Sequence, residues 1–412
     1  MNDRAEVFMF TSLLIGAGLA ASLYFAFIIF MELGDFGQWV VKSTRSKTMR
    51  AWHQRKRLSR NTLLSLVLAW GLWLVLASHI PLMMMLVISV VILLMFFSGA
   101  INPDFMMRAR QDNAVFVNTE QAQQYYHDDE SVIVYEYAGQ ARAHSDKQLV
   151  RPHVVGDRSD GPANVVMTYC GLTNLGMAVV PEINGQALSL RPVLQLENNL
   201  VMADANTDQP IQQLWGRKEC DVTAGNAGEM QQVATFRMPF AKFKQAYPNG
   251  LVFVNDYLEK GLRPPFWRNP VVYVYDRMIE LIFGLAINAQ HKMEKPIFPT
   301  IKHVDERLPS KQLVWAFNIG ESYFAYTEAF LRSQGGLVSI EAEGQTIVVN
   351  YDQEMQSLGV FYNPNQQPVI GLDFAGNLEN GEQLKRVETL KAGIFWIVWA
   401  NFFPQTELNI SQ

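Results

Sequence analysis

Two long stretches without a charged side chain constrain this chain more than any other feature. Residues 8–31 and 62–98 contain no Asp, Glu, Lys or Arg, and both are rich in large apolar side chains. At 1.5 Å of rise per residue, about 20 apolar residues carry a helix across the hydrocarbon core of a bilayer. Residues 8–31 therefore predict one membrane span, and they are too long for the apolar core of a signal peptide.

The second uncharged stretch is about twice as long as one span requires. Pro81 lies near its middle, and proline removes a backbone donor and breaks a helix. We therefore expect two spans, at about residues 62–78 and 82–99, joined by a tight turn. Together with residues 8–31, they predict an all-α, three-span membrane anchor over residues 1–100.

A basic segment separates the first span from the second. Residues 33–61 contain eight Lys or Arg residues and a single acid, Asp35. A short loop of this kind stays on the cytoplasmic side of the inner membrane. With Trp39 and Trp52 among the cations, the segment also predicts a helix lying along anionic lipid headgroups. Three spans place residues 101–412 in the cytoplasm, whereas a single traversal by residues 62–98 would place them in the periplasm.

The rest of the chain has the composition of a soluble protein. The net charge of −5 argues against a nucleic-acid partner, because a nucleic-acid-binding domain is basic. Only two cysteines occur, Cys170 and Cys220, too few for a disulfide framework. Whether these two cysteines form a disulfide is left open by the sequence.

Short β-rich runs separated by turn residues dominate residues 102–412. Helices are expected at residues 119–126, 240–246, 277–286 and 321–332. The apolar run at residues 390–403 is too short to span a membrane, so we expect it in the core. The predicted fold class is α+β, a β-rich soluble domain behind an all-α anchor. Strands are expected at residues 131–137, 164–169, 252–255, 271–275, 312–317, 346–351 and 358–362.

One pattern recurs within the soluble part. Residues 132–170 and 313–352 share the same order of apolar runs and turn residues, and from Ala143 and Ala325 onward the two segments align without an insertion or deletion. Cys170 then corresponds to Asp352. The recurrence predicts two related β-rich units, residues 101–270 and residues 271–412.

Several short motifs between residues 115 and 406 resemble those of a known family. They are Gly139–Ser145, His153–Asp157, Thr168–Thr173, Asn199–Asp204, Tyr275-Asp276, Asp305–Pro309 and Phe395–Thr406. In this order they resemble the bacterial and archaeal family called domain of unknown function 3179, which implies no established activity. The family pattern Thr-Tyr-Cys-Pro-Leu-Cys reads here with Gly171 for the proline and Thr173 for the second cysteine. The resemblance therefore does not carry a paired-thiol function to this chain.

Cys170 is the residue that the sequence singles out most sharply for chemistry. It is expected at the end of a strand and precedes Gly171, where the backbone can approach a ligand closely. A Cys170–His153 pair would suit a transition metal or an activated thiolate, although a lone cysteine at a strand end is more often simply buried. The family motifs add further candidates for this site: Tyr169, Thr173, Asp157, Asn199 and Asp204.

Two classes of function follow from these features. The first, which we prefer, is a non-catalytic, membrane-anchored binding or assembly module whose protein partner the sequence does not identify. The second is a metal- or thiol-dependent site centred on Cys170 and His153. The preference rests on the lack of a complete catalytic motif, such as a phosphate-binding loop, H-E-x-x-H or G-x-S-x-G.

Overall fold

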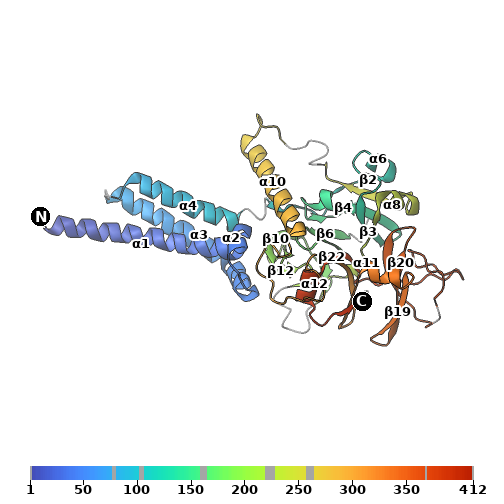
Figure 1. The fold of residues 1–412 in the computed structure, drawn as a ribbon. Coiled ribbons are helices and arrows are strands. Elements are labelled where there is room, and N and C mark those ends of the chain that lie inside the picture. The colour runs from blue at the N-terminus through green and yellow to red at the C-terminus, as the bar shows by residue number, and fades with distance from the viewer. Residues whose placement is uncertain are drawn as a thin grey trace. The chain divides into compact units, whose positions relative to one another are not determined.

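The computed structural model describes residues 2–76, 80–101, 106–157, 165–218, 228–256, 264–366 and 369–410. The chain forms two compact units, and each is described by itself (Figure 1). The first unit comprises residues 1–106 with the short segments 194–197 and 298–300. The second unit comprises the rest of the chain from residue 107.

Helices make up the N-terminal region. They are α1 (Asn2–Leu33), α2 (Asp35–Val40), α3 (Arg45–Val75) and α4 (Leu82–Ala100). Three of them are long and apolar enough to cross a membrane, over Met9–Leu33, Arg45–Val75 and Leu82–Ala100. The predicted helical region with three apolar helices is confirmed.

The three long helices pack through small side chains and interhelical hydrogen bonds. A Cβ added to Gly18 of α1 would lie 3.2 Å from the Cβ of Ala69 in α3. One turn further along α1, the Ser22 hydroxyl donates to the Thr62 carbonyl at 2.8 Å. Small residues and polar contacts of this kind are typical of helices that associate in a bilayer, where no hydrophobic effect drives them together.

The break between α3 and α4 falls where proline predicts it. α3 ends at Val75, and Pro81 is the N-cap residue of α4. Residues 77–79 lie outside the described residues. Residues 62–98 therefore form parts of two helices, as expected, rather than one long helix.

The basic segment is divided between α2 and the start of α3, and its position along lipid headgroups stays a prediction. α3 starts at Arg45 within the basic segment and continues to Val75 without a break. Neither Pro nor Gly interrupts residues 45–70, so the backbone hydrogen-bond ladder continues into the apolar stretch. Trp52, expected at the lipid surface, is only 5% exposed.

The second unit is rich in strands, with several short helices and one long one. Its helices are α6 (Thr119–Ala122), α7 (Asp146–Leu149), α8 (Phe240–Ala246), α10 (Pro270–Lys292), α11 (Glu328–Ser333) and α12 (Trp396–Phe402). The strands that follow α10 are β17 (Leu313–Ile319), β18 (Ser322–Tyr326), β19 (Leu337–Ala342), β20 (Gln345–Asp352), β21 (Ser357–Tyr362), β22 (Lys391–Phe395) and β23 (Glu407–Asn409). The strands that precede α10 are β1 (Ala109–Arg110), β2 (Val115–Asn118), β3 (Ser131–Tyr137), β4 (Gln140–Ser145), β5 (Val154–Val155), β6 (Val166–Cys170), β7 (Leu175–Val179), β8 (Glu182–Ile183), β9 (Gln186–Ala187), β10 (Leu190–Leu196), β11 (Asn199–Asp204), β12 (Pro210–Gln212), β13 (Arg217–Lys218), β14 (Gln232–Val233), β15 (Phe236–Pro239) and β16 (Leu251–Val254). The predicted α+β class with several sheets is confirmed.

Two of the sheets share the arrangement of four strands, and β2 adds a fifth strand to the first of them. One has the order β15-β3-β4-β16-β2 and the other the order β22-β17-β18-β23. In both, the first two strands are antiparallel, as are the middle two. In both, the next strand returns parallel to its neighbour, β16 to β4 and β23 to β18.

Several elements recur at the same offset along the chain, although the offset changes between the earlier and the later elements. β3 begins at Ser131 and β17 at Leu313, and the same separation relates β4 to β18 and, in neighbouring sheets, β7 to β21. Further along the chain, α8 precedes β16 by the same number of positions as α12 precedes β23. The spacing of elements along the chain is therefore similar in the two sheets.

The helix caps follow the same spacing. The Ser145 hydroxyl accepts the Gln148 amide at the start of α7. At the corresponding position before α11, the Thr327 hydroxyl accepts the Phe330 amide. A hydroxyl at the N-cap satisfies one of the backbone donors that the first helical turn leaves unpaired.

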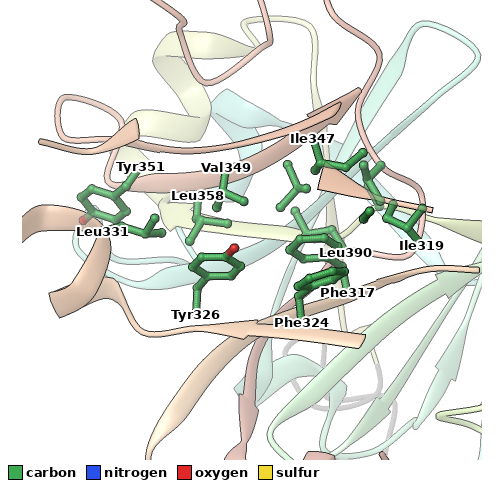
Figure 2. Packing of buried hydrophobic residues seen from close by; sticks show 14 residues of the cluster. Phe317, Ile319, Phe324, Tyr326, Leu331, Ile347, Val349, Tyr351, Leu358 and Leu390 are labelled. Carbon is green, nitrogen blue, oxygen red and sulfur yellow. The ribbon is translucent and has the colours of Figure 1, made fainter. Parts of the chain in front are cut away.

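Aromatic rings form much of the core between the later sheets. Phe317 stacks on Phe324 and on Tyr326, with ring centroids 5.3 and 6.0 Å apart. Figure 2 shows these rings below Ile347 and Val349 of β20, in a layer closed at one side by Leu331 and Tyr351. Burying one such large side chain stabilises the fold by about 1.5–3 kcal/mol.

Most predicted elements of the second unit are confirmed, but two are wrong in type. The strand predicted at residues 271–275 is part of α10: Pro270 favours the first helical turn, and the Asn269 side chain accepts the Val272 amide at 3.1 Å. The helix predicted at residues 321–332 is strand β18 followed by α11, because Ser322–Tyr326 pair with β17. The apolar run at 390–403 forms β22 and α12 and is buried, as predicted.

Candidate functional site

Cys170 is the last residue of β6 and lies fully inside the protein. The turn after it is closed by Thr173, whose amide and hydroxyl donate to the Cys170 carbonyl at 3.2 and 3.0 Å. The Cys170 sulfur lies 4.0 Å from the Asn198 carbonyl oxygen, a sulfur hydrogen-bond distance. Burial raises the pKa of the Cys170 thiol. The protonated form is therefore favoured, whereas a nucleophilic or metal-binding cysteine needs the thiolate.

His153 lies directly before β5, and its neighbours differ from those of Cys170. The Tyr169 amide donates to the His153 carbonyl at 2.8 Å, so His153 lies opposite Tyr169. Successive side chains of a strand point to opposite faces, which separates the Tyr169 face from the Cys170 face. The His153 ring packs against Phe283 of α10, with centroids 5.7 Å apart. Burial lowers the pKa of His153 to about 4.

The backbone at Gly171 is closely approached, as expected, but by a side chain of α10 and not by a ligand. A Cβ added there would lie 2.9 Å from the Ile287 Cδ1 atom of α10. On the same turn, His291 Nε2 lies 3.0 Å from the Gly171 carbonyl oxygen, and Gln290 donates to the Leu172 carbonyl at 2.7 Å. The turn that follows Cys170 is therefore covered by the C-terminal half of α10.

Asn199 belongs to a buried network of amides. Its side-chain oxygen accepts from Gln212 Nε2 at 2.6 Å and from the Leu214 amide at 3.1 Å, and its Nδ2 donates to Gln213 Oε1 at 2.9 Å. Gln213 in turn donates to the Thr168 hydroxyl at 3.0 Å, which links β11 and β12 to β6. All of these side chains are buried. The motif residues Thr168 and Asn199 thus join two sheets.

Asp204 organises the turn after β11, and Asp157 forms an isolated bridge beside β5. Asp204 ends β11 and accepts the amides of Ser189 and Thr207 at 3.0 and 3.1 Å. Although burial raises the pKa of Asp204, hydrogen bonds from Thr207, Ser189 and Asn206 hold it below its ordinary value. Asp157 forms an isolated antiparallel bridge with Asn113.

Tyr169 and Thr173 lie where the earlier and later sheets meet. Burial, followed by the nearby Asp146 carboxylate, raises the pKa of Tyr169 well above its ordinary value. Asp146 also forms a two-pronged ion pair with Arg237, at 2.8 and 2.9 Å. The Thr173 carbonyl accepts the Phe395 amide of β22 at 3.0 Å.

Gly393 completes this joint between the sheets. The Asn174 side chain donates to the Gly393 carbonyl at 2.6 Å, and Arg237 Nε donates to the Ala392 carbonyl at 3.2 Å. Gly393 has a φ of +77°, and a Cβ there would lie 3.1 Å from Arg237 Nε. Only glycine adopts this conformation at little cost.

Within the described part of the chain, no group of three or more His, Cys, Asp or Glu side chains is arranged to hold a metal ion. Cys220, the other cysteine considered from sequence, lies outside the described residues.

An open pocket of about 640 Å³ lies at one end of the β19-β20-β21 sheet. Its wall combines apolar surface from Tyr362 and Leu384 with the charged side chains of Glu382 and Lys385. Burial, followed by the Glu388 carboxylate, raises the pKa of Tyr362 to about 12, and its hydroxyl donates to Glu388 at 3.1 Å. Sequence reasoning missed this pocket. The Asn363-Pro364 turn signal marks its position, but not that the turns enclose a hollow.

Comparison with known proteins gives one match. A family model described as "Protein of unknown function (DUF3179)" matches residues 109–406, nearly all of the second unit. No curated protein and no solved structure matches the chain.

Proposed function

The chain belongs to the DUF3179 family, and we propose that it is a membrane-anchored, non-catalytic binding or assembly module. The observation that carries this proposal is the burial of Cys170 and Asn199 together with their internal hydrogen bonds. Such contacts suit a scaffold, since a reaction centre has to present its groups to a substrate. The anchor is supported by three helices of sufficient length and apolar character.

We also propose that residues 101–270 and 271–412 are two related units. The shared order of four strands and the equal offset of β3, β4 and β7 from β17, β18 and β21 support this. Cys170 then corresponds to Asp352, whose carboxylate accepts the Met355 amide at 2.9 Å. The equivalent residue of the first unit, Thr173, donates its amide to the Cys170 carbonyl. Both strand ends organise a turn, which favours a structural role for the Cys170 position.

The pocket beside Tyr362 is the binding surface that we propose for this module. Its volume of about 640 Å³ falls within the range of roughly 300–1,000 Å³ that ligand sites occupy. Apolar walls with a few charged groups, here Glu382 and Lys385, are typical of such sites. Neither residue belongs to the motifs around Cys170.

A photoreactive amino acid in place of Gln366, on the pocket wall, tests this binding surface. A matched probe in place of the exposed Gln334, at the end of α11, is the control. Irradiation of cells should give an adduct of defined mass with the first probe and none with the second. Equal labelling at both positions, or none at either, would refute the pocket as a binding surface.

Metal analysis of the full-length protein tests the scaffold role against the metal- or thiol-dependent alternative. We expect no stoichiometric transition metal in the purified protein, and we expect Cys170→Ser to leave the adduct at residue 366 unchanged. A stoichiometric metal that is lost in both Cys170→Ser and His153→Gln would establish the alternative instead.

The membrane side is a further part of the proposal. We propose that the soluble domain lies in the cytoplasm and that the exposed cations of residues 33–61, such as Lys47, Arg50 and Arg57, contact anionic headgroups of the inner membrane. A reporter fused after Gln412 that is active only in the cytoplasm should give a signal. Activity of a periplasm-specific reporter at the same position would overturn this orientation.

A further inference from the structure

Helix α10 carries apolar side chains on its outer face. Trp267, just before the helix, is 85% exposed, and Val271 in its first turn is 76% exposed. The exposed apolar residues continue at intervals of three and four positions, which places them on one face of the helix. We call the following set the α10 stripe: Trp267, Val271, Val274, Met278, Leu281 and Leu285.

The inner face of α10 combines apolar packing, through Phe283 and Ile287, with buried polar contacts. Asp276 is fully buried and forms ion pairs with Arg151 at 2.7 Å and with Arg108 at 3.2 Å. Near the other end, the buried Gln290 donates to the Leu172 carbonyl and accepts the Ile297 amide, both at 2.7 Å. A surface helix of a soluble domain normally turns its apolar side inward and its polar side to water. α10 carries exposed apolar side chains on its outer face as well, so this face suits an apolar environment.

We propose that the α10 stripe lies on the surface of the bilayer that the N-terminal helices span. This inference rests on the proposed membrane anchor. The length of the connecting chain favours lipid as the occupant, because Arg108, paired with Asp276 of α10, follows Ala100, the last residue of α4, by eight residues. Eight residues extend to at most about 29 Å. The domain that carries the stripe is therefore tethered within a short distance of the membrane.

The side chains at the ends and margin of the stripe also suit a membrane interface. Phe266 and Trp267 are exposed at its start, and aromatic rings concentrate where the hydrocarbon meets the headgroups. Arg268 and Lys292 are exposed at the two ends, and Arg277 is exposed beside the stripe. Helices that lie in the interface combine an apolar face with cations that reach the headgroups.

The experiment uses the full chain in lipid nanodiscs that hold one copy each. A fluorescent amino acid sensitive to its surroundings replaces Leu281 in the stripe, which leaves both cysteines in place. Matched probes replace Leu86, an exposed apolar residue of α4, and Gln334, an exposed polar residue at the end of α11. Lipids with a nitroxide high on the acyl chain serve as the quencher.

We expect the nitroxide lipids to quench the probes at 86 and 281 and to leave the probe at 334 bright. Quenching at 86 without quenching at 281 would overturn the inference about the α10 stripe but would still support the membrane anchor. Loss of quenching at 86 would refute the anchor and the inference together. A probe at 281 that is shielded from water only in discs with two copies would show that a second copy of this chain, and not lipid, covers the stripe.

Discussion

Replacement of Asn199 by alanine should be among the most costly single changes in the soluble unit. The variant leaves three buried partners without Asn199: Gln212 Nε2, the Leu214 amide and Gln213 Oε1. A buried polar group without a partner costs about 1–3 kcal/mol. Gln212 Nε2 keeps its hydrogen bond to the Leu200 carbonyl at 3.2 Å, and neighbouring losses do not add fully. We therefore expect the free energy of unfolding to fall by about 3 kcal/mol.

Urea denaturation of the purified full-length protein, followed by tryptophan fluorescence, measures this loss from the shift in midpoint. Asn365→Ala is the matched control, because Asn365 is exposed and its Nδ2 donates to Glu382 in an exposed hydrogen bond of 3.0 Å. The control should change the free energy of unfolding by less than about 0.5 kcal/mol. If Asn199→Ala cost no more than this control, the amide network would not hold the sheets together. The scaffold role of the family motif would then lose its main support.

Three further predictions follow from buried groups and caps. Asp276→Ala should cost about 3–5 kcal/mol, because it removes the carboxylate that pairs with the buried Arg151 charge. Arg277→Ala, at a position of α10 whose side chain is 62% exposed, should cost less than about 0.5 kcal/mol in the same urea titration. Burial lowers the pKa of His144 to about 3, whereas a histidine in the unfolded chain has a pKa near 6.5, so the unfolded chain binds more protons between these pH values. The free energy of unfolding should therefore fall as the pH drops from about 6.5 towards 3. His144→Phe should flatten that part of the curve of unfolding free energy against pH. Ser145→Ala and Thr327→Ala, the matching helix caps, should each lower the thermal midpoint by a similar amount, for a loss of about 1 kcal/mol each.

The parts of the fold that sequence predicted are those in which local preference and burial agree. Residues 131–137 and 240–246 are bounded by turn or helix-start signals, and both were predicted with the observed limits. Residues 271–275 are β-branched and aromatic, which favours a strand, but Asn269 and Pro270 start a helix there. Their exposed valines lie on the outer face of a long helix, a setting that a window of a few residues does not reveal.

The candidate site could be predicted only in part, because a sequence motif identifies residues but not the residues to which they are hydrogen-bonded. The resemblance located Asn199 and Cys170, whereas Gln212 and Gln213 lie in a segment with no period or motif of their own. Gly171 signalled a close approach, and the structure supplies Ile287 as the neighbour. That contact joins residues far apart in the chain, and a single sequence does not predict which distant residues meet.

The contacts between α10 and the turn after Cys170 give this turn a structural role that requires no catalytic activity. The helix lies in the chain between the two sheets with the same strand order, and neither sheet has a counterpart to it among the described residues. Its inner face is fixed to the earlier sheets through Asp276 and Gln290, and the second of these binds the turn at Leu172. A rigid inner attachment is what an outward apolar stripe requires, because a loosely held helix would turn its apolar side back into the protein. The motif around Cys170 thereby holds α10 in the orientation that keeps its apolar face outward.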